Sequence, residues 1–155
     1  MSVENQSANK NTTARRNNTA QRLFTGMHAF FYRLSGGKLG GTMGKAPVLL
    51  LTTTGRKTGK LRVSPLIYGQ DGDNLILIAS NGGAPIHPTW WLNLQAKPEA
   101  EVEIGSKKQR VTARQANAEE HARLWQIMVA IYPDYDNYQK KTSREIPVVI
   151  LQPEK

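Results

Sequence analysis

The spacing of hydrophobic positions changes along the chain, and each change predicts a different element. Residues 21 to 34 place apolar side chains at intervals of three and four, which forms one stripe of an amphipathic helix. The stripe comprises Leu23, Phe24, Met27, Phe30, Phe31 and Leu34. Paired glycines in "SGGKLGG" then end this helix. Residues 1 to 20 have almost no large apolar side chains, so we expect a flexible tail there.

Short extended segments dominate the rest of the chain. Apolar runs predict strands over residues 47 to 54, 61 to 68 and 74 to 80, and "GQDGD" predicts a hairpin between the last two. Further strands are predicted at residues 102 to 104, 110 to 113 and 148 to 151. Short antiparallel strands with inserted helices predict an α+β fold that is mainly β. A small split or closed barrel fits this pattern better than a parallel doubly wound sheet.

Two helices are predicted between these strands. The segment "HPTWWLNLQAKP" predicts a short helix, because Pro88 suits a first turn and Pro98 ends it. Asn117 and Glu120 have the spacing of a capping box at the start of a second helix. Its core-facing positions are Leu124, Trp125, Ile127, Met128 and Ile131. The segment "YPDYDNYQKKTSREIP" links this helix to the closing strand, and if residues 134 to 140 are helical, tyrosines spaced by three would lie on one face.

Length and composition narrow the class of protein. The chain has 155 residues, which suits one domain, and we expect residues 21 to 155 to form it. It has no cysteine, which excludes disulfides, thiolate zinc sites and a cysteine nucleophile. The three histidines are scattered, so we expect no metal site.

The net charge of +9 is concentrated in two places. Residues 1 to 45 hold seven Lys and Arg against one acid, a net of +6, and residues 56 to 62 add +4. The remaining ten Lys and Arg and eleven Asp and Glu give −1. This distribution favours recognition of a local anion, and of an anionic membrane surface, over a continuous nucleic-acid footprint. We therefore expect no nucleic-acid partner.

The turn "TTTGRKTGKLR" places Arg56, Lys57, Lys60 and Arg62 between two predicted strands. Four neighbouring cations repel one another and contribute nothing to the fold by themselves. The spacing of a Walker A loop is absent, but a glycine-flanked basic turn can bind a phosphate or carboxylate. A solvated basic hairpin is the alternative interpretation.

Two further segments have candidate chemistry. In "ASNGGAPIHPTWW", Ser80 and Asn81 follow a strand and can hydrogen-bond a planar heterocycle, while the paired glycines permit a close approach. The alternative is an ordinary loop with at least one tryptophan in the core. Tyr132, Tyr135 and Tyr138 would form either a pocket wall with hydrogen-bond donors or part of the core.

Taken in order, "LLLTTTGRKTGKLRVSPLIY", "DGDNLILIASNGGAPIHPTWWLNLQAKPEAEVEIG", "VTARQANAEEHARLW" and "YPDYDNYQKKTSREIPVVIL" resemble the deazaflavin (F420)-dependent nitroreductases and F420H2-dependent quinone reductases. The resemblance covers about residues 20 to 153. It implies a split, FMN-binding-like β-barrel that binds coenzyme F420, a flavin analogue with a phosphodiester and an oligoglutamate tail. Members of this family transfer a hydride to electron-poor compounds.

The resemblance also implies roles for particular residues. The cofactor-binding candidates are Arg56, Lys57, Lys60, Arg62, Ser80, Asn81, Gly82, Gly83, Trp90 and Asn93, with Lys38 as a weaker one. The substrate-binding candidates are Ile67, Tyr132, Tyr135 and Tyr138, and the catalytic candidates are Tyr135 and Ser80. Asn81 replaces a lysine of many relatives, and Ile67 replaces a tyrosine of a nitroimidazole-activating relative.

The expected activity is hydride transfer from reduced F420 to a quinone, a nitroaromatic compound or an activated enone. Alternatives are a non-catalytic carrier of F420 or lipid, and an FMN-dependent reductase. No apolar run approaches the roughly 20 residues that span a bilayer, and no secretory signal is evident at the start. We therefore expect a cytoplasmic protein, with peripheral contact between its N-terminal region and the inner face of the cell membrane as an open alternative.

Overall fold

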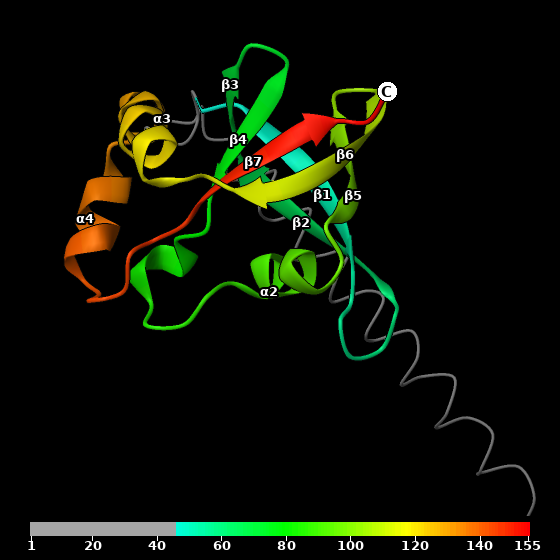
Figure 1. Ribbon diagram of the computed structural model, residues 1–155, viewed down its shortest axis with the longest axis horizontal. Coiled ribbons are helices and arrows are strands. Elements are labelled where there is room, and N and C mark those ends of the chain that lie inside the picture. Colours follow the sequence, from blue (N-terminus) through cyan, green and yellow to red (C-terminus); the bar gives the residue numbers. More distant parts are fainter. Residues whose placement is uncertain (1–45) are drawn as a thin grey trace, which may run out of the picture. The chain divides into compact units, whose positions relative to one another are not determined.

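The computed structural model describes residues 46 to 155 (Figure 1). The expected tail, the helix over residues 21 to 34 and Lys38 lie outside the described residues, so these expectations stay predictions. Seven strands form one antiparallel sheet in the order β2-β1-β5-β6-β7-β4-β3. Their bounds are Val48–Thr54 (β1), Leu61–Ile67 (β2), Gly69–Asp71 (β3), Asn74–Ile78 (β4), Glu99–Ile104 (β5), Lys107–Gln115 (β6) and Val148–Pro153 (β7).

The sheet is curled because its two edge strands are consecutive in the chain. β2 and β3 lie at opposite ends of the strand order, yet only Tyr68 separates them. The two edges must therefore approach each other at this residue, and a sheet of this kind adopts a half-barrel shape. The backbone N–H of Tyr68 also donates to the carbonyl of Pro47 at 3.2 Å. The expected α+β class and split barrel are confirmed.

One pairing predicted from the sequence was wrong. The signal "GQDGD" suggested a hairpin between residues 61 to 68 and 74 to 80, but β4 pairs with β3 and β7, and β2 pairs with β1. The chain turns a corner at Tyr68, and the hairpin is formed by the two strands that follow, β3 and β4. Gly69 permits this corner, since a Cβ there would lie 2.6 Å from the Met128 sulfur.

The helices follow the predicted pattern closely. They are α2 (Thr89–Ala96), α3 (Ala118–Ile131) and α4 (Asp134–Lys140), with a short 3-10 turn η2 (Asn81–Gly83) that the sequence did not predict. The capping box of α3 is confirmed: Asn117 Oδ1 accepts from the Glu120 N–H at 2.9 Å, and Glu120 Oε1 accepts from the Asn117 N–H at 3.1 Å. Of its predicted core face, Leu124, Trp125 and Met128 are buried and the two isoleucines are half-buried.

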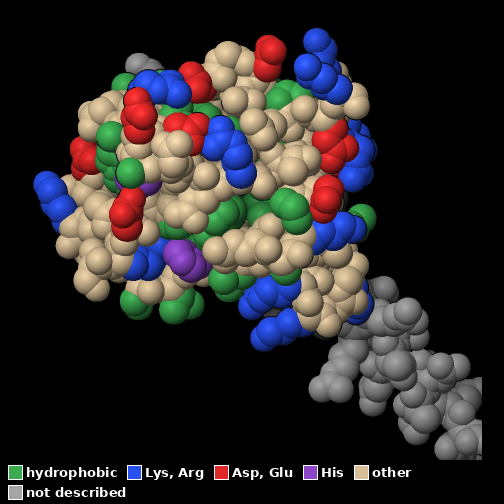
Figure 2. Space-filling view, viewed as in Figure 1, with side chains coloured by type: hydrophobic (Ala, Val, Ile, Leu, Met, Phe, Trp, Pro, Cys, Tyr) green, Lys and Arg blue, Asp and Glu red, His purple; other side chains and the backbone are tan. Residues whose placement is uncertain are grey.

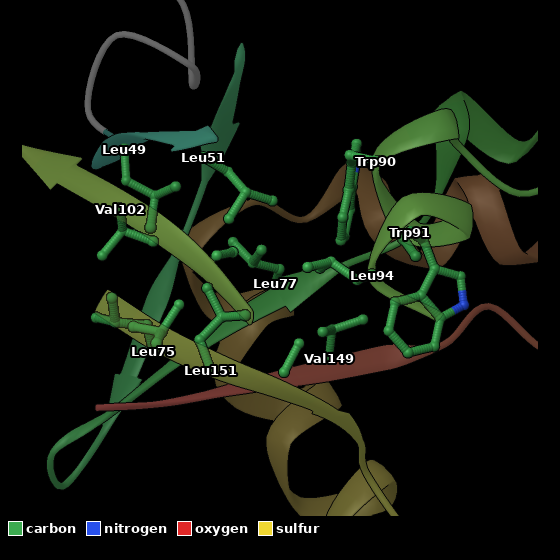
Figure 3. Packing of buried hydrophobic residues seen from close by; sticks show 14 residues of the cluster. Leu49, Leu51, Leu75, Leu77, Trp90, Trp91, Leu94, Val102, Val149 and Leu151 are labelled. Carbon is green, nitrogen blue, oxygen red and sulfur yellow. The ribbon is translucent and has the colours of Figure 1, made fainter. Parts of the chain in front are cut away.

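The core lies between the curled sheet and α2 (Figure 3). Leu51, Leu77 and Leu151 are fully buried, and each such side chain stabilises the fold by about 1.5 to 3 kcal/mol. Trp90 and Trp91 of α2 are 7% and 4% exposed and belong to the same cluster. Both tryptophans therefore pack as core residues, and this packing fixes α2 against the sheet.

Candidate functional site

The basic turn between β1 and β2 is fixed to α2 by a buried asparagine. Asn93 Oδ1 accepts from the Arg56 backbone N–H at 3.1 Å and from its guanidinium at 3.3 Å. The Asn93 amide nitrogen donates to the Thr53 hydroxyl at 3.2 Å, and both residues are 1% exposed. Buried polar groups are costly when unpaired, so this network holds the turn in one place.

The turn itself is tight and presents its charges to solvent. The Gly55 N–H donates to the Lys60 carbonyl at 2.7 Å, and Gly59 takes a φ of 72°, which suits glycine. Arg56, Lys57, Lys60 and Arg62 are all exposed. Within residues 46 to 155, no carboxylate lies within salt-bridge distance of these four. The β1–β2 turn lies at the lower edge of the described residues in Figure 1, and Figure 2 shows Lys and Arg side chains gathered at that edge.

The segment after β4 has an unusual backbone. Ser80 lies in the right-handed helical region, and Asn81, Gly82 and Gly83 follow with φ values of 48°, 65° and 85°. A right-handed residue followed by a left-handed one directs successive N–H groups toward one point, an arrangement that binds anions and carbonyl oxygens. A Cβ at Gly82 would meet no atom within 4 Å, so this backbone is open to a ligand.

Arg144, in the connection between α4 and β7, is half-buried and donates to backbone carbonyls of this segment. Its guanidinium donates to the carbonyls of Ala79 at 3.3 and 3.4 Å, Ser80 at 2.9 Å and Ala84 at 2.9 Å. It also lies 3.2 Å from Nδ1 of His87, which accepts when the ring is neutral. Burial, and then the Arg144 charge, lower the pKa of His87. These contacts give His87 a structural role.

The segment after β4 packs directly on α4. A Cβ at Gly83 would lie 2.8 Å from the Tyr138 carbonyl oxygen and 3.1 Å from the Tyr138 Cα. Only a glycine permits this approach. The left-handed φ of Gly83 also favours a glycine at this position. The predicted cofactor segment and the predicted substrate wall are therefore adjacent.

The three tyrosines form one cluster, as their spacing predicted. The ring centroids of Tyr132 and Tyr135 are 5.0 Å apart. The centroid of Tyr138 lies 6.1 Å from that of Tyr132 and 6.2 Å from that of Tyr135. The hydroxyls of Tyr132 and Tyr138 share a hydrogen bond of 3.0 Å. Burial raises the pKa of Tyr132 and of Tyr135, so both phenols keep their protons at neutral pH. Such phenols can donate hydrogen bonds but are poor bases.

Ile67 is the least directly connected of the predicted site residues. It ends β2, is 9% exposed and pairs with Val48. The corner two residues further on lies against the end of α3, since a Cβ at Gly69 would be 3.2 Å from Ile131 Cδ1. Tyr132 follows Ile131 in the chain, so it is the corner after Ile67, at Gly69, that lies beside the residue preceding the tyrosine cluster.

The sequence predicted most of these positions but missed the residues that connect them. Thr53, Gln139 and Arg144 had no motif to mark them, because each acts through a contact with a residue at least five positions away. Residues 46 to 155 contain no cluster of three His, Asp or Glu side chains that could bind a metal ion. No helix in this part of the chain is long and apolar enough to cross a membrane.

Comparison with known proteins gives a consistent result. Residues 24 to 153 match the family model described as F420H(2)-dependent quinone reductase. The F420H(2)-dependent quinone reductase Rv1261c of Mycobacterium tuberculosis is 44% identical over 129 residues, covering 81% of this chain and 87% of the relative. The solved F420-H2 dependent reductase FDR-A is 42% identical with a TM-score of 0.64, covering 68% of this chain and 94% of that one.

A more distant structure supports the fold alone. The heme storage protein HutZ of Vibrio cholerae has a TM-score of 0.56 at 16% identity, covering 72% of this chain and 84% of that one. At this level of identity the barrel is shared, and the site chemistry does not transfer.

The contact between Arg144 and His87 predicts a pH dependence of stability. Because the pKa of His87 is held below 6.5 in the folded state, the unfolded chain binds its proton at a higher pH. The contribution of neutral His87 to the free energy of unfolding is thus fully present above about pH 6.5 and declines as the pH falls below that value. His87→Gln keeps an acceptor but cannot titrate, so its urea midpoint should decline less than that of the parent between pH 7 and 5. Parallel declines would contradict this prediction.

Proposed function

The chain belongs to the F420H(2)-dependent quinone reductase family and is an F420-dependent oxidoreductase, and from this premise we propose that it reduces quinones with reduced F420. We propose further that nitroaromatic compounds and activated enones serve as acceptors. The observation that supports the proposal is one continuous surface. It is continuous as a series of contacts: Asn93 fixes the turn with the exposed cations to α2, and Gly83 of the open backbone packs on Tyr138 of the tyrosine cluster.

The residues present fit F420 on its chemistry. The cofactor combines a planar ring with a phosphodiester and several glutamate carboxylates. The four exposed cations pair with no carboxylate among the described residues, so they are available to an anionic tail. The open backbone at Gly82 and the N–H groups around Asn81 suit a phosphate or a ring carbonyl.

Each group has a distinct role in this proposal. Arg56, Lys57, Lys60 and Arg62 bind the phosphate and tail, while Ser80, Asn81, Gly82 and Gly83 border the ring. Asn93 and Trp90 contribute by fixing the turn and α2 in place. Ile67, Tyr132, Tyr135 and Tyr138 form the acceptor side and exclude water from it.

Bound reduced F420 supplies a hydride, and therefore two electrons, to the acceptor. A quinone that accepts a hydride develops negative charge on an oxygen and must take up one proton to become the hydroquinone. The Tyr135 phenol is protonated at neutral pH, as an ordinary phenol is, and burial raises its pKa further, so it can donate a hydrogen bond to that oxygen. Ser80, or a water between the two, is the second candidate donor.

The proposal is tested by mixing the anaerobic protein with reduced F420 and a soluble quinone and following the return of oxidised F420 absorbance. We expect oxidation that requires both protein and quinone, and slower or no turnover with reduced FMN or NADPH. Replacing the quinone by a nitroaromatic compound and by an activated enone tests the wider acceptor range. F420 binding without oxidation by any acceptor would instead support the carrier interpretation.

The basic turn predicts a specific loss of cofactor affinity. The double substitution Lys57→Ala and Arg62→Ala should weaken F420 binding by about 2 to 4 kcal/mol, since each charge-assisted contact contributes about 1.5 to 3 kcal/mol before screening. Fluorescence titration measures this. The matched control is Lys107→Ala with Arg110→Ala, which removes two exposed cations from the β6 strand. Equal affinities of the two double variants for F420 would support the alternative interpretation of the turn as a solvated basic hairpin.

The phenol cluster predicts separate effects on turnover and substrate binding. Tyr135→Phe removes a hydroxyl but keeps the ring, so it should lower kcat while leaving F420 affinity unchanged. Tyr138→Ala removes a pocket wall and the partner of Tyr132, so it should raise the apparent KM for the quinone. Both are measured by steady-state kinetics on several quinones and nitroaromatics. Parent-like kinetics in both variants would place this cluster outside the active site.

We also propose that the N-terminal region contacts anionic membranes. The support is in the sequence, where Lys10, Arg15, Arg16, Arg22 and Arg33 accompany the apolar stripe and each would contribute about 1 kcal/mol near an anionic surface. We expect salt-sensitive co-sedimentation with anionic vesicles that is lost when residues 1 to 22 are deleted. An intact chain that binds no vesicles would refute this.

A further inference from the structure

Arg144 is not among the residues proposed to bind the reactants, but it donates to the backbone carbonyl of one of them, Ser80, and so connects the two sides of that surface. We propose that Arg144 is a positioning residue, whose guanidinium fixes the backbone of residues 79 to 84 against α4 and so sets the cofactor segment relative to the tyrosine cluster. This inference rests on the function proposed above for the site.

The geometry requires an arginine. Three of its nitrogens make contacts in different directions: Nε donates to Ala84, Nη2 to Ser80 and Ala79, and Nη1 to Ala79. Nη1 also lies against His87 Nδ1. A lysine has three donors on one nitrogen and cannot span carbonyls from position 79 to position 84 at once.

These contacts fix the direction of the backbone carbonyls in residues 79 to 84. No carboxylate of residues 46 to 155 lies within salt-bridge distance of Arg144, so its partners are carbonyl dipoles and a neutral imidazole. By holding the carbonyls of Ala79, Ser80 and Ala84, the guanidinium supports the left-handed backbone at Asn81, Gly82 and Gly83. Asparagine tolerates a left-handed φ better than other non-glycine residues do, and surrounding contacts help to hold Asn81 in that conformation.

Arg144 is in turn fixed to the tyrosine helix. The Gln139 side chain of α4 donates to the Arg144 carbonyl at 2.8 Å and accepts from the Ile146 N–H at 2.9 Å. On the other side, Gly83 packs on the Tyr138 backbone. A change at Arg144 therefore alters the position of Ser80 relative to Tyr135, and small misplacements of reacting groups can lower turnover by about a hundredfold.

The test compares Arg144→Lys and Arg144→Ala with the parent, using three measurements on the full chain. Thermal unfolding establishes that each variant is folded, F420 titration gives affinity, and hydrogen exchange reports on the amides of residues 81 to 84. We expect faster exchange confined to that segment, F420 affinity weakened about tenfold, and kcat lowered about ten- to a hundredfold with a smaller change in KM for the quinone. Millimolar guanidinium should restore a measurable part of the affinity and kcat of Arg144→Ala.

Arg110→Lys and Arg110→Ala are the matched controls, since Arg110 is exposed and pairs with Glu154 on the sheet. Folded Arg144 variants with parent-like exchange, affinity and kcat would overturn the proposal, as would a loss that only tracks the unfolded fraction and is not rescued by guanidinium. If Arg144→Ala does not fold, Arg144→Lys decides by the same measurements. A parent protein inactive on every acceptor would refute the proposed function instead, and the exchange and affinity measurements would still decide the role of Arg144.

Discussion

The connection of β2 to β3 through Tyr68 alone is the constraint on which the rest of the structure depends. Two strands at opposite edges of a seven-stranded sheet cannot be one residue apart unless the sheet curls back on itself. The curl gives the sheet a concave interior, which the side chains of α2 help to fill (Figure 3). In Figure 1, α2 lies below the sheet, with α4 on one side of it and the β1–β2 turn on the other.

Two polar side chains, the buried Asn93 and the half-buried Arg144, connect segments that are distant in sequence. Asn93 joins α2 to the basic turn, and Arg144 joins the α4–β7 connection to the end of β4. Each replaces water as the partner of backbone groups, and removing it would leave those groups unsatisfied at a cost of about 1 to 3 kcal/mol per group. The site is thus built by hydrogen bonds between elements as well as by packing, and its geometry can be defined more tightly than that of a surface loop.

The sequence predicted those features whose cause is local. The capping box lies at the start of α3, the tyrosines lie at the end of α3 and in α4 close by, and the glycine-flanked cations lie within one turn. A short window of sequence therefore contains each signal. The β2–β4 hairpin was mispredicted because the corner at Tyr68 depends on closure of the whole sheet, which no short window shows. Arg144 gave no signal because its partners lie 57 to 65 residues earlier in the chain. Both tryptophans of α2 proved to be core residues, whereas sequence alone suggested that one could be free for a ligand.

The central claim of this account is that the exposed cations of the β1–β2 turn recognise the anionic tail of F420, while the rest of the site recognises its ring. The most direct measurement compares the affinity of the protein for F420 with its affinity for the same deazaflavin lacking phosphate and glutamates, at about 0.05 and 0.5 M salt. Salt screens exposed charges strongly over this range. The account predicts tighter binding of F420 at low salt, a marked loss at high salt, and weak, salt-independent binding of the tail-free compound. Equal affinities, or equal salt dependence for the two compounds, would contradict it.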